Sequence, residues 1–342
     1  MEIWRKKSFW IGILFFIALS IATLLVIRRE LGGQNIIEAL IEADGRWLAV
    51  AGFSMLLYIL IDCLNISSGI RHLGYDVSFS QMLLYSFVGF FFSSITPSSS
   101  GGQPGQIYYM RKNGIKVSHG SFSTLLALLS YQTMVFLWGV IGILRERDYF
   151  RSFESGYKYV FLIGFILNLF ATVFLLSVLF SKKMTRILAG IFIWFFGGKK
   201  IRPEKKHRII RFFASYHSVS VIIRKNKPAL SRILIRSFLQ IALYNSITFI
   251  CARALGVDSA DWLTFICTQA AVFVSVSSLP FPGAVGVSEL GIWTFYGNYI
   301  PADMIKNVML LSRFFSFFLP LIVSGAGILI IQLNMKKYLR TQ

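Results

Sequence analysis

The sequence predicts an all-α integral membrane protein with about six full spanning helices and two re-entrant hairpins, which are oppositely oriented within an inverted repeat. Of its 342 residues, 55% are hydrophobic and 15% are charged, whereas an average soluble domain carries about 25% charged residues. Two hydrophobic segments are interrupted by stretches rich in proline and glycine, at matching places in the two halves. Because an unpaired backbone group in hydrocarbon costs several kcal/mol, such breaks lie inside protein or beside water. Paired breaks indicate the substrate site of a secondary transporter.

Uninterrupted apolar runs of about 18 residues or more predict the full spans. We place these spans at 8–27, 47–66, 122–144, 157–180, 233–251 and 307–333. The first run follows Arg5, Lys6 and Lys7 and has no small-residue cleavage site, so we interpret it as an anchor helix rather than a signal peptide.

Each interrupted segment is expected to form two short helices joined by non-helical backbone. The predicted pairs are 79–95 with 106–110, and 262–279 with 290–299. The residues expected to hold the breaks open are Pro97, Gly101, Gly102 and Pro104 in the first pair, and Pro282, Gly283 and Gly286 in the second. A long helix precedes and follows each break, which gives the order helix, hairpin, helix twice. The alternative is that the breaks are ordinary loops between short, tilted full spans.

The distribution of lysine and arginine orients these segments. The segment 181–228 carries 13 Lys and Arg residues against one acid, Glu204, and retention of positive charge predicts that it is cytoplasmic. Basic residues beside the first and last spans place both termini on the same side. With these sides fixed, the first hairpin must enter from the cytoplasm and the second from outside.

The whole chain, 1–342, is therefore expected to form a single polytopic membrane domain. Its first repeat covers 47–144 and its second repeat covers 230–333. The basic segment 181–228 lies between them and contains two apolar or mixed runs that are short for a span. These runs predict either interfacial amphipathic helices on the inner leaflet or an additional cytoplasmic hairpin.

Ionisable residues inside the membrane are costly, so each one is a candidate functional group. Glu289 follows the second break, where a carboxylate can cap the returning helix or bind substrate. Arg313 lies in the last span, and Glu289 is the nearest acid in its repeat. An ion pair between the two is expected, and an Arg that faces a cavity is suited to a phosphate.

Further polar residues of the first repeat are candidates for substrate binding, each with a simpler alternative. Asp62 and Asn65 share one helix face. They either line the cavity or lie at the water-exposed end of their helix. Arg111 can receive a phosphate head group or act only as a cytoplasmic anchor. The hydroxyls and backbone N–H groups around the first break offer the components of an anion nest. The nest candidates are Ser98, Ser99 and Gln103. Five neutral side chains are expected to join helices: Gln132, Asn168, Gln240, Asn245 and Gln269.

Several classes of chemistry find no signature in the sequence. No catalytic residue, metal site or cofactor is predicted, because the four His residues are scattered and no nucleophile or nucleotide-binding motif occurs. The three Cys residues have no paired spacing. The net charge of +20 is explained by cytoplasmic Lys and Arg near anionic phospholipid head groups, so membrane lipids are the expected partners and nucleic acid is not.

Both breaks resemble motifs of a known family. The first similarity runs through Thr96-Pro97, Gly101-Gly102-Gln103-Pro104, Tyr108-Tyr109-Met110-Arg111-Lys112 and Gly114. The second runs from Pro282 to Glu289, with Ala284 in place of the middle glycine of a Pro-Gly-Gly-x-Gly-x-x-Glu pattern, and Arg313 and Pro320 match the last helix. The chain thus resembles the lysylphosphatidylglycerol synthase transmembrane family, which includes the flippase domain of the bacterial multiple peptide resistance factor.

This resemblance implies a lipid translocase of a bacterial plasma membrane that moves an anionic or aminoacylated phospholipid, such as lysylphosphatidylglycerol, between leaflets, with a role in resistance to antimicrobial peptides. Larger relatives carry a soluble aminoacyl-transferase domain. Because the sequence ends at Gln342, just after the last predicted span, we expect that activity to be missing here. Two alternatives remain: a membrane-embedded transferase or its subunit, with Glu289 or Asp62 as base, and a secondary transporter of small solutes or ions. A second copy of the chain and a separate synthase are the protein partners left open.

Overall fold

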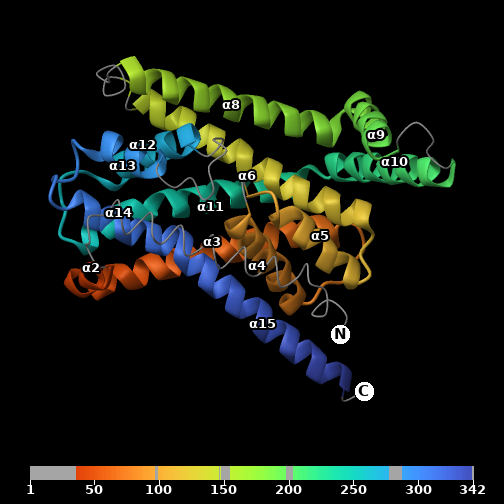
Figure 1. The fold of residues 1–342 in the computed structure, drawn as a ribbon, viewed down its shortest axis with the longest axis horizontal. Helices are drawn as coiled ribbons and strands as arrows, with labels where there is room; N and C mark the ends of the chain where they lie inside the picture. The colour runs from red at the N-terminus through yellow and green to blue at the C-terminus, as the bar shows by residue number, and fades with distance from the viewer. Residues whose placement is uncertain are drawn as a thin grey trace.

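The computed structural model describes residues 36–96, 99–145, 147, 155–197, 203–276 and 287–340, and the regular secondary structure in this part of the chain is helical. The helices are α2 (Ile36–Glu42), α3 (Gly45–Arg71), α4 (Phe79–Ile95), α5 (Gly102–Lys112), α6 (Val117–Arg145), α8 (Ser155–Phe180), α9 (Lys182–Gly197), α10 (Pro203–Lys225), α11 (Lys227–Ala254), α12 (Trp262–Val276), α13 (Val287–Tyr296), α14 (Ile305–Arg313), the π-helix η4 (Phe314–Phe318) and α15 (Leu319–Arg340). Figure 1 shows their arrangement.

Five helical segments among the described residues are long and apolar enough to cross a membrane. They are Gly45–Arg71, Val117–Arg145, Leu162–Phe180, Lys227–Ala254 and Ile305–Leu333. Each overlaps a predicted span, so the α-helical membrane class is confirmed and five of the predicted spans are helices that could cross a membrane. The predicted span at 8–27 lies outside the described residues.

The predicted short helices are also present, as α4 and α5 in the first half and α12 and α13 in the second. The first break is shorter than predicted, because α5 begins at Gly102 rather than near residue 106. Gly101 precedes the helix, and Pro104 falls in its first turn, where the missing N–H costs no helical hydrogen bond. Pro97 and Ser98 lie outside the described residues, as does the second break at 277–286, which contains Pro282, Gly283 and Gly286.

An antiparallel pair, α3 and α11, forms the centre of the molecule. At one end the Asp44 N–H donates to the carbonyl oxygen of Ala254 at 2.8 Å. Further along, Asn65 donates to the Ser237 hydroxyl at 3.1 Å. Because residue numbers rise on one helix while they fall on the other, the two chains run in opposite directions. Small residues in the contact, such as the fully buried Ala51, bring the helices close together.

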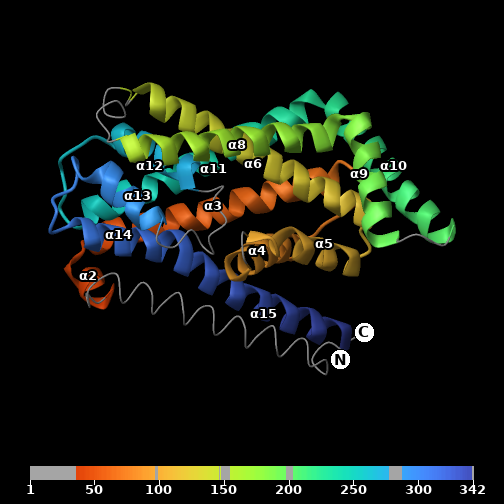
Figure 2. The same ribbon diagram turned by 45° about the horizontal axis from the view of Figure 1, so that its top comes forward.

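The short helix α4 packs against α15, and the short helix α12 packs against α6. In the α6–α12 contact, a Cβ atom at Gly142 would lie 2.4 Å from the carbonyl oxygen of Cys267. In the α15–α4 contact, Gly325 and Gly327 lie beneath the rings of Phe91 and Phe87. Figures 1 and 2 show α4 and α5 toward the end that carries α9 and α10, and α12 and α13 toward the opposite end.

The segment between the two halves forms a helical hairpin, α9 and α10, that leads from the peripheral helix α8 into α11. α8 exposes large apolar side chains, including Leu162, Ile166 and Phe170. α10 packs on α6, where the rings of Phe122 and Tyr216 lie 5.5 Å apart. The sequence predicted either interfacial helices or an additional hairpin for this basic segment. α10 agrees with the hairpin because it packs on α6, whereas α9 keeps exposed apolar residues such as Trp194.

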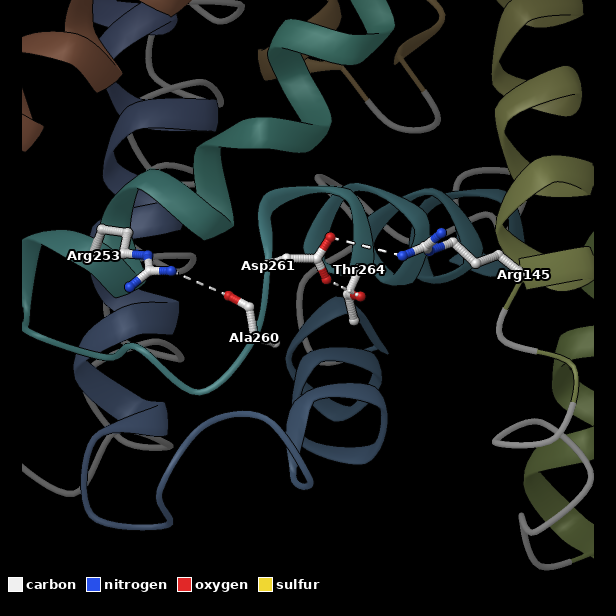
Figure 3. A network of polar contacts seen from close by, with 5 residues as sticks. All are labelled: Arg145, Arg253, Ala260, Asp261 and Thr264. Atoms are coloured by element: carbon white, nitrogen blue, oxygen red, sulfur yellow. Dashed lines mark hydrogen bonds and ion pairs between the residues drawn. The ribbon is translucent and has the colours of Figure 1, made fainter.

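Asp261 starts α12 and links it to α6. Its carboxylate accepts hydrogen bonds from Thr264 and lies 3.7 Å from the Arg145 guanidinium. Figure 3 shows the Asp261 carboxylate in contact with both of these residues, with Arg253 donating to the Ala260 carbonyl oxygen nearby. The hydrogen bonds from Thr264, together with Arg145, lower the pKa of Asp261 from its usual value.

The first prediction concerns this N-cap. Asp261→Ala should lower the free energy of unfolding by about 1 kcal/mol, because an N-cap acceptor is lost, whereas Asp261→Asn should retain most of the stability at neutral pH. The charge contributes fully above about pH 4, the unfolded-state pKa, and its contribution is lost as pH falls through the lower folded-state pKa. The free energy of unfolding of Asp261→Asn should therefore lack this loss at acid pH. Thermal unfolding in detergent across the acid range tests this, and equal acid sensitivity of wild type and Asp261→Asn would contradict it.

The second prediction concerns the close approach of α6 and α12. Gly142→Ala should destabilise the protein by about 1–3 kcal/mol, because the new methyl group meets backbone and forces the helices apart. The matched control is Gly190→Ala on α9, where a Cβ meets open space and helix propensity alone should stabilise by about 0.5–1 kcal/mol. Thermal unfolding in detergent measures both, and changes of the same sign would show that the contact is not formed.

Candidate functional site

The candidate site is built around a polar stripe on α3. Tyr58, Asp62 and Asn65 follow one another at intervals of four and three residues, so they lie on one face of the helix. This face meets α4, α6 and α11. The site therefore combines helices from both halves of the chain.

Asp62 is held by neutral groups from α4 and α11. The Ser86 hydroxyl donates to a carboxylate oxygen at 2.6 Å, and Gln240 lies within hydrogen-bonding reach. Among the residues that the structure describes, no basic side chain forms an ion pair with Asp62. The half-buried carboxylate is thus stabilised by hydrogen bonds alone, which is costly for an ionised group inside a candidate membrane span.

Aromatic side chains from five helices surround the next turn of the stripe. The Tyr58 hydroxyl donates to the Tyr131 hydroxyl of α6 at 3.4 Å. The Tyr58 ring lies 5.7 Å from the ring of Tyr244 on α11 and 5.5 Å from that of Phe90 on α4. Tyr244 in turn lies 5.0 Å from the ring of Phe273 on α12. Both hairpins and the central pair therefore meet at this aromatic cluster.

Arg313 approaches the same cluster from the last helix. It ends α14, its guanidinium lies 5.9 Å from the centre of the Phe317 ring, and it acts electrostatically on Tyr244. The π-helix that follows has a local cause: Pro320 cannot donate to the carbonyl of Ser316 and would clash with it, so the helix widens. Ser316, on this widened turn, hydrogen-bonds Tyr244.

Asn65 shares the predicted face with Asp62 but serves a different partner. Its amide donates to Ser237 of α11, and one turn further on Arg236 donates to the Ser68 hydroxyl at 2.9 Å. These contacts join α3 to α11, so the structure places Asn65 in the helix–helix contact rather than beside Asp62's carboxylate.

Four of the five predicted helix-joining side chains form contacts between helices. Gln132 bonds Asn168 and Gln269 bonds Thr248, and Gln240 donates to the backbone carbonyl of Tyr58 at 3.4 Å. Asn245 differs, because its buried amide has no hydrogen-bond partner among the described residues. Gln240 has an additional role, since it also reaches Asp62.

Two backbone N–H groups of the predicted anion nest already donate to local acceptors. Ser99 donates its N–H to the Thr96 carbonyl oxygen at 3.1 Å, and Gly101 donates to the Thr96 hydroxyl at 2.8 Å. Ser99 itself is exposed, with a φ angle of 54°, and Gln103 is half-buried. These N–H groups are therefore satisfied within the turn, and the nest that the sequence predicted has fewer donors to offer.

The remaining candidates are Arg111 and Glu289. Arg111 is exposed at the last turn of α5, beside Lys112, whose ammonium lies over the Tyr108 and Tyr109 rings. Glu289 is described only as a residue of the first turn of α13, so its ion pair with Arg313 stays a prediction.

Four polar members of the site were not predicted: Tyr58, Ser86, Tyr131 and Tyr244. Each lies in a strongly apolar run, where a single Ser or Tyr is common as packing. One available signal was the helical spacing from Gln240 to Tyr244, which repeats the spacing from Tyr58 to Asp62 on the partner helix. No group of three or more His, Cys, Asp or Glu residues that could hold a metal ion occurs within the described part of the chain.

These features define a multi-pass α-helical membrane protein with a polar and aromatic interior. The chain belongs to the lysylphosphatidylglycerol synthase transmembrane family, whose sequence pattern matches residues 9–324. It is 23% identical to a UPF0104 membrane protein of Archaeoglobus fulgidus over 88% of this chain and 91% of the relative. It is 24% identical to a UPF0104 membrane protein of Methanocaldococcus jannaschii, covering 93% and 95%, and 23% identical to an uncharacterized protein of Mycoplasma genitalium, covering 85% and 80%.

Proposed function

We propose that the protein is a lipid translocase of the plasma membrane, with both termini in the cytoplasm, that moves an anionic or aminoacylated phospholipid between leaflets. Many secondary transporters expose one site alternately to the two sides by moving one structural repeat against the other. The observation that carries the proposal is therefore the way in which the helices of the two halves pack.

The packing of each half has a counterpart in the other. α3 precedes the first hairpin and α11 precedes the second, and these two helices lie antiparallel at the centre. α4 of the first hairpin packs on α15, the last helix of the second half, while α12 of the second hairpin packs on α6, the last helix of the first half. Such exchange supports an inverted repeat with re-entrant hairpins.

The polar site lies where these halves meet, as a transport site should. Asp62, Tyr58 and Tyr131 come from the first half, whereas Tyr244 and Arg313 come from the second. Arginine presents a planar fork of donors suited to a phosphate, so Arg313 is the proposed contact for the lipid phosphate, with Glu289 as its partner in the unloaded protein. An amphiphilic substrate agrees with the large apolar surface of α8 and α15.

The test is leaflet exchange of a fluorescent phosphatidylglycerol in liposomes that contain the purified protein. Wild type should exchange the probe faster than protein-free liposomes. Arg313→Gln should lose about tenfold or more of this rate, because a charge-assisted contact to phosphate contributes about 1.5–3 kcal/mol.

The matched control is Lys206→Gln, which removes one exposed positive charge from α10 and should leave the exchange rate nearly unchanged. Size-exclusion chromatography checks that both variants fold. A wild-type rate equal to that of empty liposomes would reject the lipid translocase, and equal rates for the two variants would remove Arg313 from the site.

A further inference from the structure

Asp62 is the only acidic residue within the five candidate spans of the described chain. It lies in the middle of α3, seventeen positions after the first residue of that helix. Two acidic residues outside these spans lie beside arginines: Asp261 beside Arg145, and Asp258 beside Arg253. Asp62 forms no such ion pair within the part of the chain that the structure describes.

The groups that face Asp62 are neutral on every helix packed around it. α3 itself contributes Tyr58 and Cys63, α4 contributes Ser86, and α6 contributes Tyr131. α11 contributes Gln240 and, one turn further on, Tyr244, on which Arg313 of α14 acts electrostatically. A carboxylate in such surroundings is neutralised either by a bound cation or by a proton.

We propose that Asp62 is a proton-binding site and that its protonation couples lipid movement to a proton gradient. The coupling rests on the proposed function, whereas proton binding does not. A proton needs no additional room, which suits a half-buried carboxylate that is already hydrogen-bonded by Ser86 and Gln240. Binding converts the carboxylate and a proton into a carboxylic acid, and no electrons are transferred. The proton is taken from water on one side of the membrane and released on the other side.

Protonation changes the hydrogen bonds that join three helices. The ionised group accepts from Ser86 on the first hairpin and from Gln240 on the central helix of the other half. Once protonated, Asp62 donates one hydrogen bond and accepts fewer. Ser86 has an alternative acceptor in place, since its hydroxyl lies 3.4 Å from the Ile59 carbonyl oxygen. The proton thereby loosens the hairpin from the carboxylate without stranding a donor.

Proton binding is tested first, without any transport measurement. Infrared spectra of the protein in liposomes should contain a protonated-carboxyl carbonyl band near neutral pH that is lost in Asp62→Asn. The band should remain in the control Asp303→Asn, which changes an exposed acid outside the spans. In Ser86→Ala the band should persist to higher pH, because the ionised form loses a donor. If Asp62→Asn does not fold, the Ser86→Ala titration decides whether Asp62 binds a proton. Wild-type and Asp62→Asn spectra that coincide at every pH, or a Ser86→Ala titration that matches wild type, would overturn proton binding.

Coupling is tested in the same liposomes with the membrane potential clamped at zero. For one proton per lipid, a pH difference of about one unit should drive about a tenfold difference in fluorescent phosphatidylglycerol between leaflets. Asp62→Asn should show a ratio of one. A wild type that exchanges lipid but also stays at a ratio of one would overturn the coupling and leave the translocase intact. No exchange in wild type would reject the translocase and, with it, the coupling, while the infrared result alone would then decide whether Asp62 binds a proton.

Discussion

The contact between α3 and α11 forms the core on which α4, α6, α12 and α14 pack directly. Lipid chains are as apolar as leucine, so helices in a bilayer do not associate through the hydrophobic effect and depend on close packing and interhelical hydrogen bonds. This pair uses both: small residues such as Ala51 and Ser54 are buried in the contact, and Asn65 and Arg236 donate across it. The remaining helices of each half pack around this pair.

A helix too short to span the membrane is stable there only when the unpaired backbone N–H and C=O groups at its ends find hydrogen-bond partners. α4 and α12 are shorter than a span, so their terminal backbone groups need partners inside the protein. At the end of α4 the Thr96 hydroxyl donates to the Phe92 carbonyl oxygen at 2.6 Å, and it accepts from the Gly101 N–H just before α5 at 2.8 Å. Glycines allow α4 and α5 to approach each other closely. A methyl group at Gly89 on α4 would clash with α5, and one at Gly102 on α5 would clash with α4.

Hydropathy and proline positions predicted most of the fold from the sequence, because spanning helices follow directly from the cost of burying polar groups in hydrocarbon. The start of α5 was misplaced, since Pro104 reads as a breaker but is tolerated in a first turn. The site was predicted only in part. Asp62 and Arg313 were identified because charge is rare in a membrane, whereas Tyr131 and Tyr244 look like ordinary packing residues. Asn65 was placed on the right face, but sequence spacing does not reveal the Ser237 hydroxyl that it meets on α11.

The central claim is that the two hairpins enter the membrane from opposite sides, and cysteine labelling tests it most directly. Cys63, Cys251 and Cys267 are buried and would be replaced before a single cysteine is introduced at Ser99 or Gly286. With a membrane-impermeant maleimide in sealed, oriented vesicles, Ser99→Cys should be labelled only from the cytoplasmic side, and Gly286→Cys only from outside. Labelling of both positions from the same side would contradict the inverted repeat.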